Sequence, residues 1–147
     1  MQHEEAVKQW VELADKDLAL AEHTAKTMWP IPHEIVCFHC QQFVEKYLKA
    51  FLVSKGQEPP YIHDLVKLTA LCESENAAFN EIRQKCIALT EYGVQPRYPN
   101  NMQINEEDMI RALNFAVEIK TFLLEKAPEF SWKYLKPRFV KSQTREM

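Results

Sequence analysis

Four polar side chains on one predicted helix, residues 33–54, are the best placed in this sequence to do chemistry. An imidazole, an amide and two ammonium groups follow at spacings of three, four and three residues: His39, Gln42, Lys46 and Lys49. Residues three or four apart lie on one side of a helix, so these side chains form a stripe. Such a stripe would suit a phosphate-bearing ligand. The alternative is that the lysines are solvated and His39 is a core residue with a satisfied hydrogen bond.

A second candidate lies at the start of the next predicted helix. His63 and Asp64 follow a loop that contains Pro59 and Pro60. His63 could contact a ligand at the mouth of this helix. The structural alternative is a helix cap, in which the Asp64 carboxylate accepts backbone N–H groups and His63 packs over the loop.

A third candidate is a loop in which Arg97 and Tyr98 stand between Pro96 and Pro99. Arginine can hold a phosphate through two parallel hydrogen bonds, and a tyrosine ring offers a stacking surface. Equally, Arg97 could hold the loop to a carboxylate of the protein. Both interpretations stay open on the sequence.

The four cysteines invite a redox or metal interpretation, because Cys37 and Cys40 form a CxxC pair. A reactive pair usually stands at a helix N-terminus, whereas Cys37 comes a turn inside the predicted helix. A zinc site would need a second pair, and Cys72 and Cys86 are isolated. We therefore expect four buried, reduced thiols in a cytoplasmic protein, and no metal. The sequence also has no glycine-rich phosphate loop, paired-carboxylate metal site or GxSxG nucleophile, so no catalytic residue is assigned.

Composition indicates a single helical domain. The chain has 147 residues, 46% of them hydrophobic and 27% charged, with only two glycines, which favours long helices over tight turns. A net charge of −3 gives no overall attraction to nucleic acid or anionic membranes. Since every apolar stretch is interrupted by charge, we expect a soluble protein without a membrane span.

Apolar periodicity and stop signals predict five helices, over about residues 4–27, 33–54, 63–72, 79–93 and 105–126. The second is placed at the centre because a wide apolar arc runs along it: Val36, Cys37, Cys40, Val44, Tyr47, Leu48 and Phe51. Its short connection to the first helix predicts an antiparallel hairpin. The predicted fold is all-α, an up-and-down, four-helix-bundle-like domain over residues 1–127.

Residues 128–147 are expected to be a separate C-terminal tail. Four aromatic residues stand there among five basic ones: Phe130, Trp132, Tyr134 and Phe139 with Lys133, Lys136, Arg138, Lys141 and Arg145. The tail could pack on its own bundle, cross to a second subunit or bind a partner.

Three motifs in this order resemble the HEPN family: the run from Phe38 to Leu52, then His63-Asp64-Leu65, then Arg97-Tyr98-Pro99. Asp15, Asp17 and Leu18 also resemble its opening pattern, so the resemblance covers roughly residues 5–126. It implies a bundle of about five helices, commonly a homodimer. Members often accompany a minimal nucleotidyltransferase of the DNA polymerase β type and were proposed to bind nucleotides. Others are metal-independent endoribonucleases of toxin–antitoxin and defence systems.

The ribonuclease members use an Arg followed four to six residues later by His, and this chain lacks that pattern after Arg83 and Arg97. Without the imidazole, a ribose 2′-hydroxyl has no proton acceptor. We therefore predict a non-catalytic homodimeric module that binds a nucleotide or phosphate ligand, or RNA, beside a nucleotidyltransferase partner. No cofactor is expected other than the ligand, and the predicted binding residues are His39, Gln42, Lys46, Lys49, His63, Arg97 and Tyr98.

Two alternatives remain beside this prediction. One is an endoribonuclease whose active-site motif departs from the common pattern of the family, and in which His63 or His39 acts with Arg97. The other is a purely structural assembly partner, whose aromatic tail docks on another protein.

Overall fold

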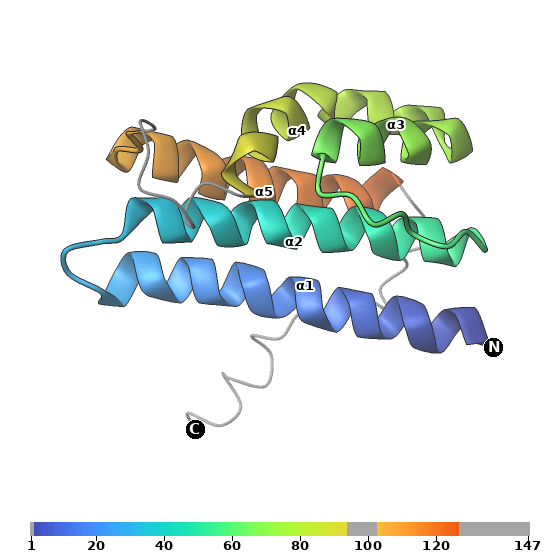
Figure 1. Ribbon diagram of the computed structural model, residues 1–147, viewed down its shortest axis with the longest axis horizontal. Helices are drawn as coiled ribbons and strands as arrows, with labels where there is room; N and C mark the ends of the chain where they lie inside the picture. The colour runs from blue at the N-terminus through green and yellow to red at the C-terminus, as the bar shows by residue number, and fades with distance from the viewer. Residues whose placement is uncertain (1, 94–102, 127–147) are drawn as a thin grey trace.

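The computed structural model describes residues 2–93 and 103–126, and all regular structure in this part of the chain is helical (Figure 1). The predicted all-α bundle of five helices is confirmed. The elements, in chain order, are α1 (Gln2–Thr27), α2 (His33–Ser54), α3 (Leu65–Glu75), a 3₁₀ segment (Ala77–Ile82), α4 (Arg83–Thr90), a 3₁₀ turn (Glu91–Gly93) and α5 (Glu106–Lys126).

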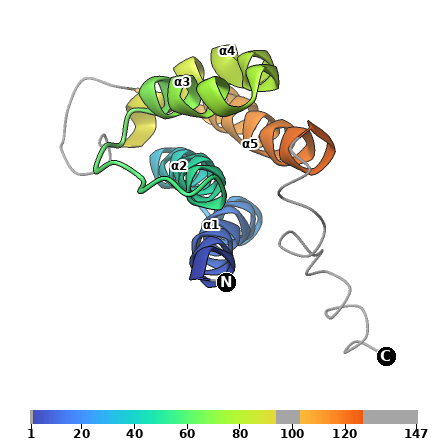
Figure 2. The same ribbon diagram turned by 90° about the vertical axis from the view of Figure 1, so that its right-hand side faces the viewer.

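Helix α2 lies at the centre, as the sequence predicts. An end-on view shows α1 on one side of α2, with α3, α4 and α5 on the other (Figure 2). All seven residues of the predicted apolar arc are buried. Fully burying a side chain the size of leucine or phenylalanine stabilises a fold by about 1.5–3 kcal/mol, so this helix supplies much of the core.

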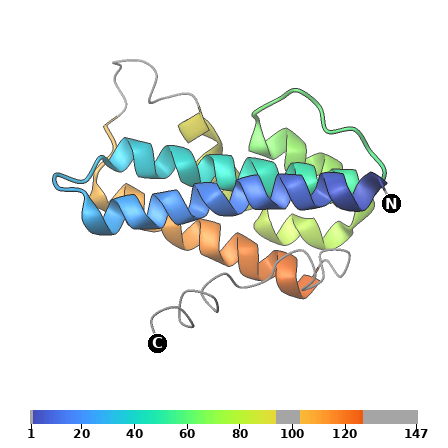
Figure 3. The same cartoon turned by 90° about the horizontal axis from the view of Figure 1, so that it is seen from below.

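Helices α1 and α2 form the predicted antiparallel hairpin (Figure 3). Much of their contact is apolar, because α1 turns its Val7, Val11, Ala14, Leu18 and Ala21 toward the core. The hairpin brings the middle of α1 beside the polar stripe of α2, which positions the carboxylates described below.

Side-chain caps define where two helices begin. The Asp64 carboxylate accepts hydrogen bonds from the backbone N–H groups of Val66 (2.9 Å) and Lys67 (3.3 Å), so the predicted cap of α3 is confirmed. At α5 the Asp108 N–H donates to the Asn105 side chain at 2.9 Å, and the Asn105 N–H donates to Asp108 at 3.1 Å. This reciprocal capping box fixes the start of α5.

The fourth predicted helix is more irregular than expected. It begins as the 3₁₀ segment Ala77–Ile82 and becomes α-helical at Arg83. The Asn76 side chain accepts the Ala78 N–H at 3.0 Å, which holds the chain in a turn before the helix starts. Phe79 and Ile82 stand three residues apart, which matches the three residues per turn of a 3₁₀ helix, and both are buried.

All four cysteines are free and buried, as predicted. Burial raises the pKa of Cys37 to about 12 and that of Cys86 to about 11. Burial also raises the pKa values of Cys40 and Cys72 well above the usual thiol range. The CxxC pair therefore holds protonated core thiols at neutral pH.

Candidate functional site

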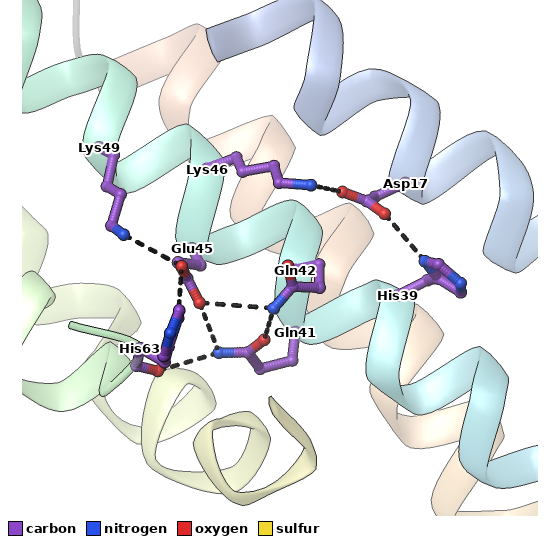
Figure 4. A network of polar contacts seen from close by, with 8 residues as sticks. All are labelled: Asp17, His39, Gln41, Gln42, Glu45, Lys46, Lys49 and His63. Carbon is purple, nitrogen blue, oxygen red and sulfur yellow. Dashed lines mark hydrogen bonds and ion pairs between the residues drawn. The ribbon is translucent and has the colours of Figure 1, made fainter. Parts of the chain in front are cut away.

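One half of the predicted stripe meets a carboxylate of α1. The His39 ring contacts Asp17 through Nδ1, 2.8 Å from Oδ1, and the Lys46 ammonium donates to Oδ2 at 2.5 Å. Figure 4 shows the two α2 side chains reaching Asp17 from positions two turns apart. We call these three residues the Asp17 cluster.

The Asp17 carboxylate is ionised within this cluster. Its side chain is only 11% exposed, and burial by itself opposes ionisation. The hydrogen bonds and positive charge of His39 and Lys46 outweigh burial and hold the pKa of Asp17 below its usual value. A carboxylate thus anchors the imidazole and the ammonium group on the surface of the hairpin.

The other half of the stripe meets Glu45, which also lies on α2. Its Oε2 is 3.1 Å from the Lys49 ammonium and 3.0 Å from the Nδ1 atom of His63. Its Oε1 accepts from the Gln41 amide at 3.2 Å and from the Gln42 amide at 3.5 Å (Figure 4). We call these five residues the Glu45 cluster.

Burial explains why Glu45 has so many partners. Its side chain is 5% exposed, and an ionised carboxylate inside a protein needs hydrogen bonds and an opposite charge. Lys49 supplies that charge with a side chain that is 6% exposed, and its Nζ also lies 5.8 Å from the ring centre of Trp10. Lys49 is therefore not solvated, whereas Lys46 forms an ion pair with Asp17 and keeps 24% of its side chain exposed.

Gln41 joins the Glu45 cluster to two other segments. Its amide nitrogen donates to the backbone carbonyl of His63 at 3.0 Å, just before α3. On its other side, Gly93 packs so closely that a Cβ there would lie 2.9 Å from Gln41 Cδ. The sequence marks Gly93 only as a helix stop, but the structure requires it for this close approach.

The structure therefore divides the predicted binding set. His39 and Lys46 meet on Asp17, whereas Gln42, Lys49 and His63 meet on Glu45. Arg97 and Tyr98 lie outside the described residues. His39 has the hydrogen bond that its structural alternative expects, but its side chain is 20% exposed and does not lie in the core. His63 contacts Glu45 in addition to following the loop.

The residues that sequence reasoning missed are the acceptors at the centres, Asp17 and Glu45, and the linking amide of Gln41. A signal was present for Glu45, because it stands four residues before Lys49 on a helix with little solvent-facing surface. A charge on such a helix requires a partner. No comparable pattern connects Asp17 to His39 and Lys46, because they belong to different helices.

The comparison with known families agrees with the three motifs. A family model described as HEPN domain matches residues 7–127. The chain belongs to the HEPN family. No curated protein and no solved structure matches this HEPN domain.

In this HEPN domain, a carboxylate orients the imidazole ring of each cluster, that of His39 and that of His63. Because Nδ1 of His39 and of His63 contacts a carboxylate, the other ring nitrogen, Nε2, is left for further contacts. A protonated ring would donate from Nε2 to an anion, and a neutral ring with a proton on Nδ1 would accept there. The His63 side chain is 65% exposed and that of His39 only 20%, so His63 is the more accessible.

Residues 2–93 and 103–126 contain neither a group of side chains that could hold a metal ion nor a helix that could span a membrane. Within these ranges, no three His, Cys, Asp or Glu side chains are grouped closely enough to hold a metal ion. Over the same ranges, no helix has the length and apolar character needed to cross a membrane.

Proposed function

We propose that this HEPN domain is a non-catalytic module that binds a nucleotide or another small phosphate-bearing ligand. The observation that carries the proposal is the contact between His63 and Glu45. A buried carboxylate holds Nδ1 of an imidazole that is otherwise largely exposed. In its protonated form this ring presents an oriented N–H donor to an anion.

The charges of the two clusters favour a small anion. Each contains one carboxylate, one ammonium group and one imidazole, so each is neutral with a neutral ring and carries +1 with a protonated ring. The whole chain has a formal net charge of −3. Long nucleic acids require many neutralised phosphates, so a nucleotide suits this site better than RNA does.

The predicted binding residues then take different parts. His63, Gln42, His39 and Lys46 are proposed to contact the ligand, because each retains some exposure. Lys49 acts indirectly, through its ion pair with the buried Glu45.

Arg97 and Tyr98 stay predicted contacts in this proposal. The chain reaches Arg97 four residues after Gly93, which packs on Gln41. Four residues span at most about 14 Å, so the connection is short enough for Arg97 to contact the Glu45 cluster in this proposal.

Assembly forms the remaining part of the proposal. HEPN domains commonly dimerise, and this chain belongs to that family. We propose a homodimer that works in the cytoplasm beside a minimal nucleotidyltransferase.

A thermal-shift titration tests the binding function. Purified protein is melted with nucleoside mono-, di- and triphosphates, and a ligand that binds the native state raises the midpoint with concentration. We expect a saturating shift that is lost in His63→Gln and reduced in Lys46→Ala. The matched control is His23→Gln, since His23 is an exposed histidine of α1 outside both clusters. Flat curves at millimolar ligand would overturn the proposal.

The same contact favours one second candidate, a metal-independent endoribonuclease. A neutral His63 ring held at Nδ1 by Glu45 presents Nε2 as an acceptor for the proton of a ribose 2′-hydroxyl. Structured and single-stranded RNA incubated in EDTA would then be cleaved by the natural protein and spared by His63→Gln. No cleavage at high protein concentration eliminates this candidate. Flat melting curves together with intact RNA would indicate a structural assembly partner.

A further inference from the structure

An exposed apolar stripe runs along α5. Ile110, Val117 and Leu124 stand seven residues apart and are 47%, 44% and 44% exposed. Seven residues are nearly two helical turns, so the three side chains form a line about 21 Å long. Single exposed apolar residues are normal on a protein surface, whereas several on one face of a helix form a candidate contact surface.

The stripe does not face the core of its own bundle. The opposite side of α5 carries the buried residues Ala112, Ala116 and Ile119. Lys120 of α5 reaches sideways to Asp15 of α1, with 3.5 Å between Nζ and Oδ1. The α5 stripe thus lies outside the contacts that hold α5 to the described part of the domain.

The sequence that follows α5 starts beside this stripe. Residue 127 comes three positions after Leu124, and the carbonyl of Lys126 accepts a hydrogen bond from the Asn76 side chain at 3.3 Å. An extended chain needs only about seven residues to cover 21 Å. The aromatic residues of the tail therefore fall within reach of the whole stripe: Phe130, Trp132, Tyr134 and Phe139.

Charge favours the same pairing. Residues 127–147 hold five basic and two acidic side chains, a net +3, while the other 13 basic and 19 acidic residues of the chain sum to −6. Glu106 precedes the stripe by one turn and Glu125 follows Leu124 directly, and both are exposed. Among the described residues, the ion pairs of the protein include neither glutamate.

We propose that residues 127–147 of the same chain dock on the α5 stripe. The aromatic side chains cover Ile110, Val117 and Leu124, and the basic side chains meet the acidic residues at the two ends of the stripe. Apolar burial supplies the affinity and opposite charge sets the orientation.

Trypsin cleavage within the tail, after Lys133, Arg138 and Lys141, tests this docking on the full-length protein. We expect cleavage about tenfold slower than in a free peptide of residues 127–147, because a docked segment must open before it is cut. Val117→Glu, or Val117→Ser if the first variant does not fold, should bring the rate close to that of the peptide. Trp132→Ala should do the same while leaving the stripe intact.

The matched control is Ile87→Glu, because Ile87 is a 43% exposed apolar residue of α4, outside the stripe. This variant should keep the protection of the natural protein.

Light scattering after size-exclusion chromatography gives the mass of each variant in parallel. Protection that is absent from the natural protein, or unchanged by Val117→Glu and Val117→Ser, overturns the proposal. If the protein is a dimer, and Val117→Glu separates it without changing the cleavage rate, the stripe is instead the interface with a second copy. If the protection of the natural protein is lost on dilution, the stripe binds the tail of a second copy. Either of these results also overturns it.

Discussion

Glu45 and Lys49 form an ion pair inside the bundle, with 3.1 Å between Oε2 and Nζ and about 95% of each side chain hidden from solvent. The pair stands on one helix, one turn apart. His63, Gln41 and Gln42 supply further hydrogen bonds to the same carboxylate. This helix therefore carries a buried charge pair next to His63, which is the most exposed candidate binding group among the described residues.

Removing one partner of this pair should be costly. Lys49→Met leaves Glu45 buried without its cation, and such changes destabilise proteins by about 3–5 kcal/mol. Urea unfolding of the variant measures the loss. The double variant Glu45→Leu, Lys49→Met should recover most of the stability, and Lys67→Met, at an exposed position of α3, should have little effect. Equal losses in the single and double variants would contradict this account.

Gly93→Ala should disturb Gln41 specifically. The added Cβ would lie 2.9 Å from Gln41 Cδ, and overpacking of this kind costs about 1–3 kcal/mol. In a Gln41→Ala background the same change should cost much less, because the obstructing amide is gone. Gly56→Ala is the control, since its cost comes from a backbone φ of 79° and should be the same in both backgrounds. Additive losses for Gly93→Ala and Gln41→Ala would show that the two residues do not press on each other.

The Asp17 cluster predicts a loss of stability in acid. Hydrogen bonds from His39 and Lys46, acting against burial, hold the pKa of Asp17 below its unfolded value. A lowered folded pKa contributes stability that is present above about pH 4 and is lost as the pH falls through the folded pKa. Asp17→Asn should therefore have a lower free energy of unfolding than the natural protein at pH 7. The difference in free energy should become smaller as the pH falls below 4. Urea unfolding between pH 3 and pH 7 measures this margin, and a constant difference would contradict the prediction.

The thiols should be inert in the native state. Burial raises the pKa of Cys37 to about 12, so at pH 8 only about one molecule in ten thousand carries its thiolate. Ellman's reagent should report almost no free thiol before unfolding and four in urea. Glu58→Cys, at an exposed loop position, provides the reactive control. Because folding raises the pKa of Cys37, the contribution of this thiol to the free energy of unfolding is complete below the unfolded pKa. That contribution declines as the pH rises toward 12.

The helices were predictable because their signals are local. Pro30 and Pro32 stop α1, Asp64 caps α3 and Asn105 begins α5, each through backbone groups within a few residues. The 3₁₀ segment before α4 was not predicted, because apolar spacing of three residues fits both helix types over one turn.

The site was predictable only in part. The stripe on α2 follows from helical geometry, and its side chains do lie near one another (Figure 4). The carboxylate that each of these side chains contacts depends on how α1 and the loop before α3 pack against α2. This packing is a tertiary property. The partners of Asp17 stand on another helix, so the pattern of α1 alone does not indicate them.

The Asp17 cluster also fixes how far α1 can move along α2. Its two oxygens bind His39 and Lys46, which stand seven residues apart and therefore mark two levels of the same helix. A slide of one turn, about 5.4 Å, would break both contacts and leave the carboxylate buried without a partner. An apolar seam alone tolerates such a slip far better, because neighbouring turns of α1 present similar small and branched residues. Together with Asp15, which accepts a hydrogen bond from the Tyr47 hydroxyl of α2, Asp17 selects one alignment of the hairpin from several that apolar packing would accept.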